Sequence, residues 1–227
     1  MSLTVHQLEK LEESLKILKK SDRLLISGSA GVGKTYLVNE LIGKLSDQSK
    51  NIKIFCSAPT NKAVAVLKGK VEERNNLEFT TVHSALKIKR QVNFKTGAIT
   101  FKPNFSDKYP PLKGIGLFII DESSMLSSEL LKYVEEQAIS NKCTVIFIGD
   151  QKQLNPVGEE VSPVFVKNYP EVELTEIIRQ GAGNPIIDLS RNLNIIADRC
   201  DNRVDNKGYL FSNDVSQVVE TLAAVNG

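Results

Sequence analysis

The chain has 227 residues, of which 41% are hydrophobic and 25% are charged, so it can bury a sizeable core. Its 29 basic and 27 acidic residues leave a net charge of +2, which excludes a histone-like or polybasic protein. The three cysteines are too few for a disulfide framework or a zinc site, and no apolar run approaches the roughly 20 residues that cross a membrane. These features predict a reduced, cytoplasmic protein with no membrane partner.

Short apolar runs alternate with helical patterns from residue 21 to about residue 176. Runs of this kind are typical of buried strands, and they occur at Leu24–Ile26, Ile52–Cys56, Leu117–Ile120 and Thr144–Ile148. Helical patterns lie between them, around residues 36–45 and at Ala63–Lys70 and Ser128–Ile139. This rhythm predicts an α/β fold with a mostly parallel sheet covered by helices on both faces.

Residues 87–113 interrupt this rhythm with seven basic residues and one acidic residue. Phe94 and Phe101 lie among these charges, and Thr96-Gly97 predicts the turn of a hairpin between Val92–Lys95 and Ala98–Lys102. Basic and aromatic side chains together are typical of surfaces that bind single-stranded nucleic acid. A solvated hairpin whose phenylalanines pack on the body of the protein explains the composition equally well.

The residues after Arg179 carry no recognisable chemistry. A helix is expected at Ile186–Ile196, a strand at Tyr209–Phe211 and a helix at Val215–Val225.

A glycine-rich segment connects the first expected strand to the first expected helix of this rhythm. It reads Gly28-Ser29-Ala30-Gly31-Val32-Gly33-Lys34-Thr35 and fits the phosphate-loop pattern. Its glycines allow the backbone N–H groups to turn inward toward phosphate oxygens, and the following helix presents its positive end. We expect Lys34 to reach the outer phosphates and the Thr35 hydroxyl to hold Mg²⁺. The segment therefore predicts a nucleoside triphosphate site.

Two acidic residues, Asp121 and Glu122, follow the third expected strand. We expect Asp121 to hold the metal and Glu122 to act as the base that activates water. Gly149–Gln153 ends the fourth strand in the same way. Because parallel sheets bind ligands beyond the carboxyl ends of their strands, the three segments should share one crevice.

Together these motifs resemble the superfamily 1 helicases, most closely the RecD/Dda-like DNA helicases, over roughly residues 3–180. The strand-contacting motifs of that family are similar to Ala58–Ala63 (Ala-Pro-Thr-Asn-Lys-Ala) and Thr81–Ser84 (Thr-Val-His-Ser), and its sensor motif is similar to Gly149–Pro156. The resemblance implies a RecA-like P-loop domain that uses ATP and Mg²⁺, with residues 87–113 as a small hairpin that engages the duplex fork.

The resemblance also implies roles for single residues. Gln7 would read adenine; Gln153 would sense the terminal phosphate; Arg179 would stabilise that phosphate in the transition state. The ATP site would comprise Gln7, Gly28, Ala30, Gly31, Val32, Gly33, Lys34, Thr35 and Asp121. Pro59, Thr60, Asn61, His83, Phe94 and Phe101 would contact the strand.

Each of these residues alone also has a structural interpretation. Thr60 and Asn61 could begin a helix as capping residues. His83 could be a packing residue, and Arg179 could pair with Glu176 on the surface. The ordered set is more specific than any of its members.

We therefore expect residues 1–180 to form an ATPase domain and residues 181–227 to begin a truncated region, because a second motor domain needs on the order of 100 residues. The implied function is that of a monomeric, ATP-hydrolysing helicase that moves on single-stranded DNA (RNA is possible), unwinds duplex and works beside replication or repair proteins. This chain alone should bind nucleotide, hydrolyse it slowly and not unwind. The alternatives are a nucleotide-switched binding module without motor activity and an unrelated NTPase such as a small kinase.

Overall fold

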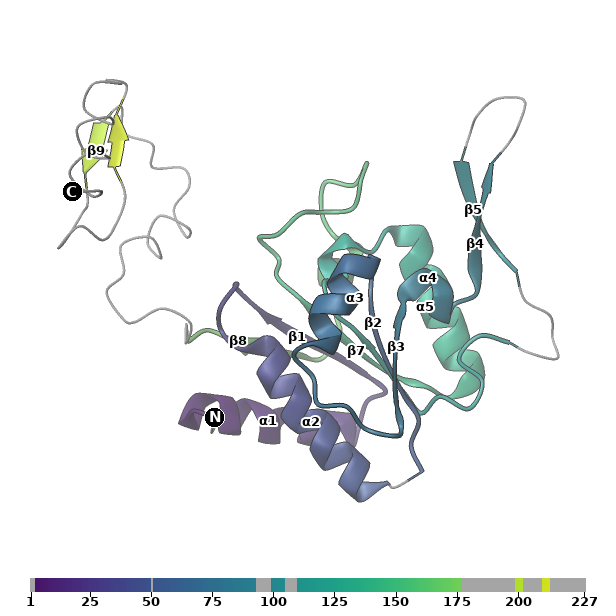
Figure 1. Cartoon of the computed structure of the whole chain (residues 1–227). Coiled ribbons are helices and arrows are strands. Elements are labelled where there is room, and N and C mark those ends of the chain that lie inside the picture. Colours follow the sequence, from purple (N-terminus) through teal and green to yellow (C-terminus); the bar gives the residue numbers. More distant parts are fainter. Residues whose placement is uncertain are drawn as a thin grey trace. The chain divides into compact units, whose positions relative to one another are not determined.

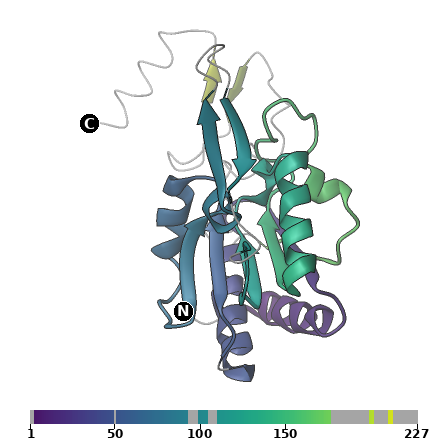
Figure 2. The same cartoon turned by 90° about the vertical axis from the view of Figure 1, so that its right-hand side faces the viewer.

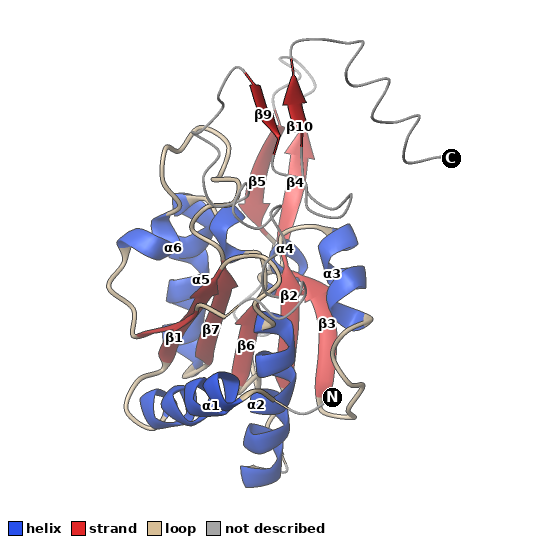
Figure 3. Cartoon of the chain, turned by 90° about the vertical axis from the view of Figure 1, so that its left-hand side faces the viewer, coloured by secondary structure: helices blue, strands red, loops and turns tan. Residues whose placement is uncertain are grey.

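The computed structural model describes residues 3–49, 51–92, 99–104, 110–176, 199–201 and 210–212, and the chain divides into two compact units, Met1–Glu176 and Ile177–Gly227. The first unit contains a six-stranded sheet in the order β3-β2-β6-β7-β1-β8, in which every neighbouring pair is parallel. Most of this sheet can be followed in Figure 3. The predicted α/β fold with a parallel sheet is confirmed.

The predicted strands form the middle of this sheet. They are β1 (Arg23–Gly28), β2 (Ile54–Ala58), β6 (Leu117–Ile120) and β7 (Thr144–Gly149). All four residues of β6 are buried, because a central parallel strand is covered on both faces. Two edge strands, β3 (Leu77–Thr81) and β8 (Glu171–Leu174), were not expected. β8 is buried only at alternate residues, so its sequence lacks the continuous apolar run of a central strand.

Helices cover both faces of the sheet. α3 (Asn61–Lys68) and α5 (Ser128–Asn141) lie on opposite sides of it (Figure 2). The core on the α5 side is centred on Phe118, Phe147 and Val134, and α4 (Val82–Ala85) and α6 (Pro163–Val166) contribute to the same cluster. α2 (Lys34–Gln48) contacts β1, while α1 (Val5–Leu18) contacts β1, β8 and α2. None of the helices in the described ranges is long and apolar enough to cross a bilayer.

The basic insert contains an antiparallel hairpin, seen beside α4 and α5 in Figure 1. Its strands are β4 (Ile88–Val92) and β5 (Ile99–Pro103), with Ile88 opposite Pro103. The predicted hairpin is therefore confirmed, but its first strand begins four residues earlier than expected. Ile88 is buried and belongs to the core cluster, which fixes the start of the strand on the body. The predicted turn at Thr96-Gly97 lies outside the described residues.

The second unit contains one described feature, an antiparallel pair of β9 (Arg199–Asp201) and β10 (Leu210–Ser212). The strand expected at Tyr209–Phe211 overlaps β10, and its partner was not expected. The two helices predicted for this unit fall outside the described residues.

Candidate nucleotide and nucleic-acid site

The predicted motifs lie at the carboxyl ends of neighbouring strands. The phosphate loop follows β1, Asp121 follows β6, and Asp150 follows β7. Pro59 follows β2, and α4 follows β3 directly. Since all of these strands are parallel, their carboxyl ends meet at one edge of the sheet. The fold therefore brings together segments that are up to about 120 residues apart in the sequence.

The phosphate loop is shaped by its glycines. Gly33 has φ 83° and forms the N-cap of α2, a backbone conformation that costs little without a Cβ. At Gly28, φ is +149° and an added Cβ would lie 2.4 Å from the Leu174 carbonyl oxygen of β8. Gly28 thus permits the close pairing of β1 and β8 at the point where the loop begins.

The Lys34 ammonium lies inside this loop. It donates hydrogen bonds to the Gly28 carbonyl at 2.5 Å and to the Ser29 carbonyl at 3.1 Å. Burial lowers the pKa of Lys34, and the negative charges of Asp150, Asp121 and Glu122 oppose this effect. Three acidic side chains from two different strand ends thus act on one half-buried cation.

The acidic pair is held by backbone hydrogen bonds. The Asp121 N–H donates to the Ser57 carbonyl at 2.8 Å, and the Glu122 N–H donates to Asp121 Oδ1 at 2.9 Å. Burial raises the pKa of Asp121, although the hydrogen bond from Glu122 and the Lys34 charge counteract the shift. Burial, followed by the Asp121 charge, raises the pKa of Glu122. A carboxylate with a raised pKa accepts a proton more readily, as a general base must.

Glu122 has an unusual backbone conformation, with φ 52° and ψ 38°. This left-handed conformation is costly for a residue with a side chain and is found mainly where the surrounding structure enforces it, as at functional sites. The next residue provides one such constraint, because the Ser123 hydroxyl donates to the Ile148 carbonyl of β7 at 2.9 Å. The acidic pair is therefore attached to two strands.

Two charged residues near this pair were given no role from the sequence. Asp150 belongs to the segment Gly149–Gln153 that was expected in the crevice, and its charge has the largest charge effect on the Lys34 pKa. The positive charge of Lys70, which follows α3, lowers the pKa of both Asp121 and Glu122. Nothing in the sequence around Lys70 indicates this proximity.

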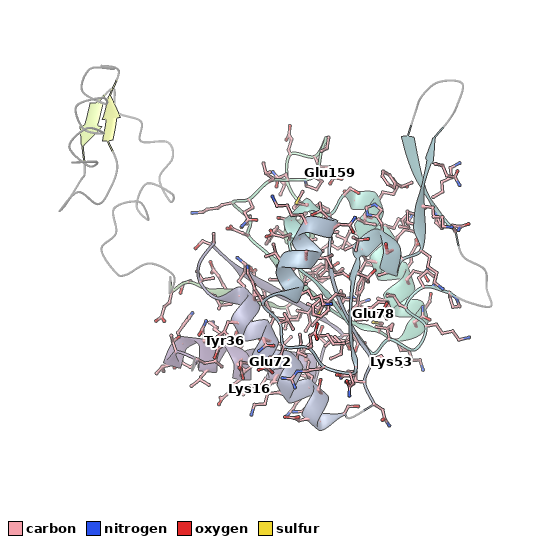
Figure 4. The ribbon with its side chains drawn as sticks, in the orientation of Figure 1. Lys16, Tyr36, Lys53, Glu72, Glu78 and Glu159 are labelled. Carbon is pink, nitrogen blue, oxygen red and sulfur yellow. The ribbon has the colours of Figure 1, made fainter. Side chains whose placement is uncertain are left out.

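The sensor motif folds into a turn after β7. Asp150 organises it, since its carboxylate accepts from the Lys152 N–H at 3.0 Å and its carbonyl accepts from the Gln153 N–H at 3.0 Å. Glu159 fixes the far end of the loop on α5, accepting from the Ser128 N–H at 2.7 Å and from the Ser128 hydroxyl at 2.8 Å. Glu159 can be found above the sheet in Figure 4.

Gln7 connects α1 to the phosphate loop. Its side chain is only 2% exposed, and its Nε2 donates to the Val32 carbonyl at 3.4 Å. Its Oε1 accepts from the Thr4 N–H in a capping box at the start of α1. The adjacent His6 accepts from the Thr175 N–H at 3.4 Å, so the first turn of α1 contacts both the phosphate loop and the segment after β8.

The predicted strand-contacting residues lie on α3, α4 and the hairpin. Thr60 is the N-cap of α3 and accepts from the Ala63 N–H at 3.2 Å, so its capping role is real; Asn61 is exposed beside it. The His83 ring packs on the Phe101 ring of β5, with centroids 4.9 Å apart. Burial lowers the pKa of His83, while Phe101 remains 47% exposed.

Arg179 and Phe94 lie outside the described residues. For the predicted magnesium site, Thr35 is in the first turn of α2 and Asp121 follows β6, so one hydroxyl and one carboxylate are available. In the ranges that the structure describes, no three His, Cys, Asp or Glu side chains form a metal site by themselves. This donor set fits Mg²⁺, which takes one or two protein ligands and completes its shell with phosphate oxygens and water.

Comparison with known proteins gives a consistent family. A family model described as an AAA domain matches residues 12–159. The ATP-dependent DNA helicase Dda of Enterobacteria phage T4 is 35% identical over 186 residues, which cover 78% of this chain and 39% of that protein. The RecBCD subunit RecD of Buchnera aphidicola is 29% identical, covering 97% of this chain and 38% of the relative.

A solved structure has the same fold. The crystal structure of the Pif1 helicase from Candida albicans matches with a TM-score of 0.60 and 24% identity, over 85% of this chain and 44% of that one. The chain thus spans less than half of the length of these relatives. With its phosphate loop, acidic pair and sensor turn at one edge of a parallel sheet, the chain belongs to the AAA-domain family, and its relatives Dda and RecD are superfamily 1 helicases.

Proposed function

We propose that residues 1–180 form an ATP-hydrolysing motor domain that moves on single-stranded DNA and unwinds duplex in replication or repair, acting as a monomer in the cytoplasm. The observation that carries the proposal is the placement of the phosphate loop, the Asp121-Glu122 pair and Asp150 at the carboxyl ends of neighbouring parallel strands, where the three acidic residues act on the half-buried Lys34. A pure binding module needs the cation but not this set of acids.

Lys34 binds and orients the triphosphate. Its ammonium already lies within the loop, and a phosphate oxygen offers it a charged acceptor in place of the neutral Gly28 and Ser29 carbonyls. Charge-assisted hydrogen bonds of this kind are about twice as strong as neutral ones. Mg²⁺, held by the Thr35 hydroxyl and Asp121, would supply neutralisation of the phosphate charge.

Glu122 accepts the proton of the attacking water. Its raised pKa matches this task. Gln153, held by the turn at Asp150, contacts the terminal phosphate, and Arg179 neutralises the charge that develops there. The pairing of His83 with Phe101 gives strand contacts a direct link to the hairpin.

The test measures nucleotide binding and ATP hydrolysis by the chain, with and without single-stranded DNA. Lys34→Ala should abolish both, whereas Lys44→Ala, an exposed lysine on the same helix, should change neither. Turnover that rises with DNA supports the motor. Nucleotide-dependent DNA binding without any turnover would instead favour a switch, and nucleotide binding that survives Lys34→Ala would refute the site.

A further inference from the structure

A small groove lies beside the edge strand β3, where the hairpin leaves the body. We call it the root groove; residues of β2, β3, α4, the start of the hairpin and the segment 110–115 border it. Its volume is about 250 Å³, which is below the roughly 300–1,000 Å³ of typical small-molecule sites. A space of this size suits one unit of a longer ligand better than a free cofactor.

The root groove has an apolar floor and a charged rim. Phe55, Leu112 and Ile115 contribute the floor, and Phe55 is half-buried with its ring edge-on to Phe118 at 6.5 Å between centroids. Lys87 and Lys113, both exposed, stand on the rim. Glu78, which projects from β3 in Figure 4, is the acidic side chain among the lining residues, so the lining carries a net positive charge.

The position of the groove links two predicted nucleic-acid elements. Ser84 of α4 lines it on one side, and Lys87, the residue before β4, lines it on another. The Ser84 hydroxyl accepts from the Thr81 hydroxyl at 2.9 Å within the strand-contacting motif. The groove therefore lies between the strand-contacting motif at α4 and the start of the hairpin.

We propose that the root groove binds one nucleotide of a nucleic-acid strand, with its base against Phe55 and its phosphate beside Lys87 and Lys113. The charge of the rim favours this occupant over an acidic or neutral peptide, and stacking on an aromatic ring accepts any base. This inference rests on the proposed function, since it extends the strand path that begins at α4.

The first experiment removes the two charges without straining the backbone. Lys87 has φ 52°, so the variant Lys87→Asn keeps a residue type that tolerates this conformation, and it is combined with Lys113→Gln. Anisotropy of a labelled forked oligonucleotide should show about five- to tenfold weaker binding near 0.1 M salt. The slope of log affinity against log salt should fall by about 1.4, because each lost phosphate contact contributes about 0.7.

The matched control is Lys16→Ala on α1, an exposed lysine on the opposite side of the view in Figure 4 from Glu78. It should leave affinity and slope unchanged. Glu78→Gln should strengthen binding by roughly two- to threefold, because it removes the negative charge beside the phosphate. An affinity loss equal in Lys16→Ala and the double variant would overturn the inference.

The second experiment reports on the floor directly. The chain contains no tryptophan, so Phe55→Trp places a single tryptophan in the groove, and its emission can be excited selectively beside the tyrosines. A base stacked on the new indole ring should quench its emission on addition of the oligonucleotide, whereas the emission of a Lys16→Trp variant should not respond.

The outcomes separate the two proposals. If the unmodified chain binds no oligonucleotide, the proposed function fails and the groove inference fails with it. If the chain binds, but the double variant binds equally well and the emission of Phe55→Trp stays constant, the groove inference alone is wrong. Unchanged DNA binding by the double variant, together with a response of the Phe55→Trp emission to an apolar peptide, would assign the groove to a protein partner instead.

Discussion

At the scale of single residues, the candidate site holds ionisable side chains where burial disfavours their charged forms. Asp121 lies at the end of a fully buried strand, and its pKa is raised despite the nearby Lys34 and Lys70 charges. The folded protein therefore holds this proton more tightly than the unfolded chain does. The Asp121 carboxyl therefore contributes to the free energy of unfolding while it is protonated, and this contribution is lost as the pH rises through the raised pKa.

Asp121→Asn should consequently stabilise the protein at pH 7 while abolishing ATP hydrolysis. An asparagine oxygen can still accept from the Glu122 N–H, and the cost of burying a charge is removed. We expect the melting temperature to rise by about 2–4 °C, which corresponds to about 1 kcal/mol in a domain of this size. Thermal melts between pH 3 and pH 8 test this, and the gain should disappear at the acid end.

The control for this experiment is Asp47→Asn, an exposed carboxylate on α2. It should leave the melting temperature unchanged across the same range. A variant at Asp121 that melts lower than the unmodified chain at pH 7 would mean that the carboxylate stabilises the fold through its partners.

The location of a site residue could be predicted from the sequence where its motif directly follows a strand. Asp121 and Lys34 were expected in one crevice because parallel strands end at one edge, and they do influence each other. The proximity of Lys70 to the acidic pair could not be inferred in this way. It depends on how α3 lies over the sheet, which is a property of packing and not of local pattern.

At the scale of elements, loops are fixed by a few side chains that bond to helix ends. Glu159 holds the loop after Gln153 by accepting both the N–H and the hydroxyl of Ser128, in the first turn of α5. A carboxylate at a helix N-terminus satisfies donors that have no partner within the helix and meets the positive end of its dipole.

Glu159→Ala should therefore release this loop and destabilise the protein by about 1 kcal/mol. Hydrogen exchange should become faster at the Ser128 amide and in residues 151–160, while exchange in β7 should stay the same. Glu160→Ala is the matched control, because the neighbouring contact uses the Glu160 backbone carbonyl, which accepts from Asn155. Equal exchange rates in the two variants would contradict the role assigned to Glu159.

The burial of each strand determines whether it could be predicted from the sequence. The four central strands were predicted because burial on both faces produces continuous apolar runs. β3 and β8 lie at the edges of the sheet. No residue of β3 is fully buried, only alternate residues of β8 are, and the alternation Glu171-Val-Glu-Leu is too short to stand out. The first hairpin strand was placed too late because the burial of Ile88 depends on the core beneath it.

At the scale of the whole molecule, the described sheet and its core cluster lie within Met1–Glu176, whereas Arg179 belongs to the second compact unit. Binding and catalysis should therefore be separable. Lys34 and Asp121, which we propose to hold the triphosphate and its metal ion, are in the first unit. The arginine that the family resemblance assigns to the transition state is in the second.

A fragment of residues 1–176 should unfold cooperatively, with a melting temperature within a few degrees of the full chain, because it keeps the whole core cluster. It should bind ADP as tightly as the full chain, yet its ATP hydrolysis should fall to background, since loss of a catalytic arginine costs about 10³-fold or more. Arg179→Ala in the full chain is the matched variant. It should likewise keep its affinity for ADP and lose ATP hydrolysis to background. Calorimetric titration with ADP and a phosphate-release assay distinguish the outcomes. A fragment that loses ADP binding, beside an Arg179→Ala chain that keeps it, would show that the second unit contributes to nucleotide binding through residues other than Arg179.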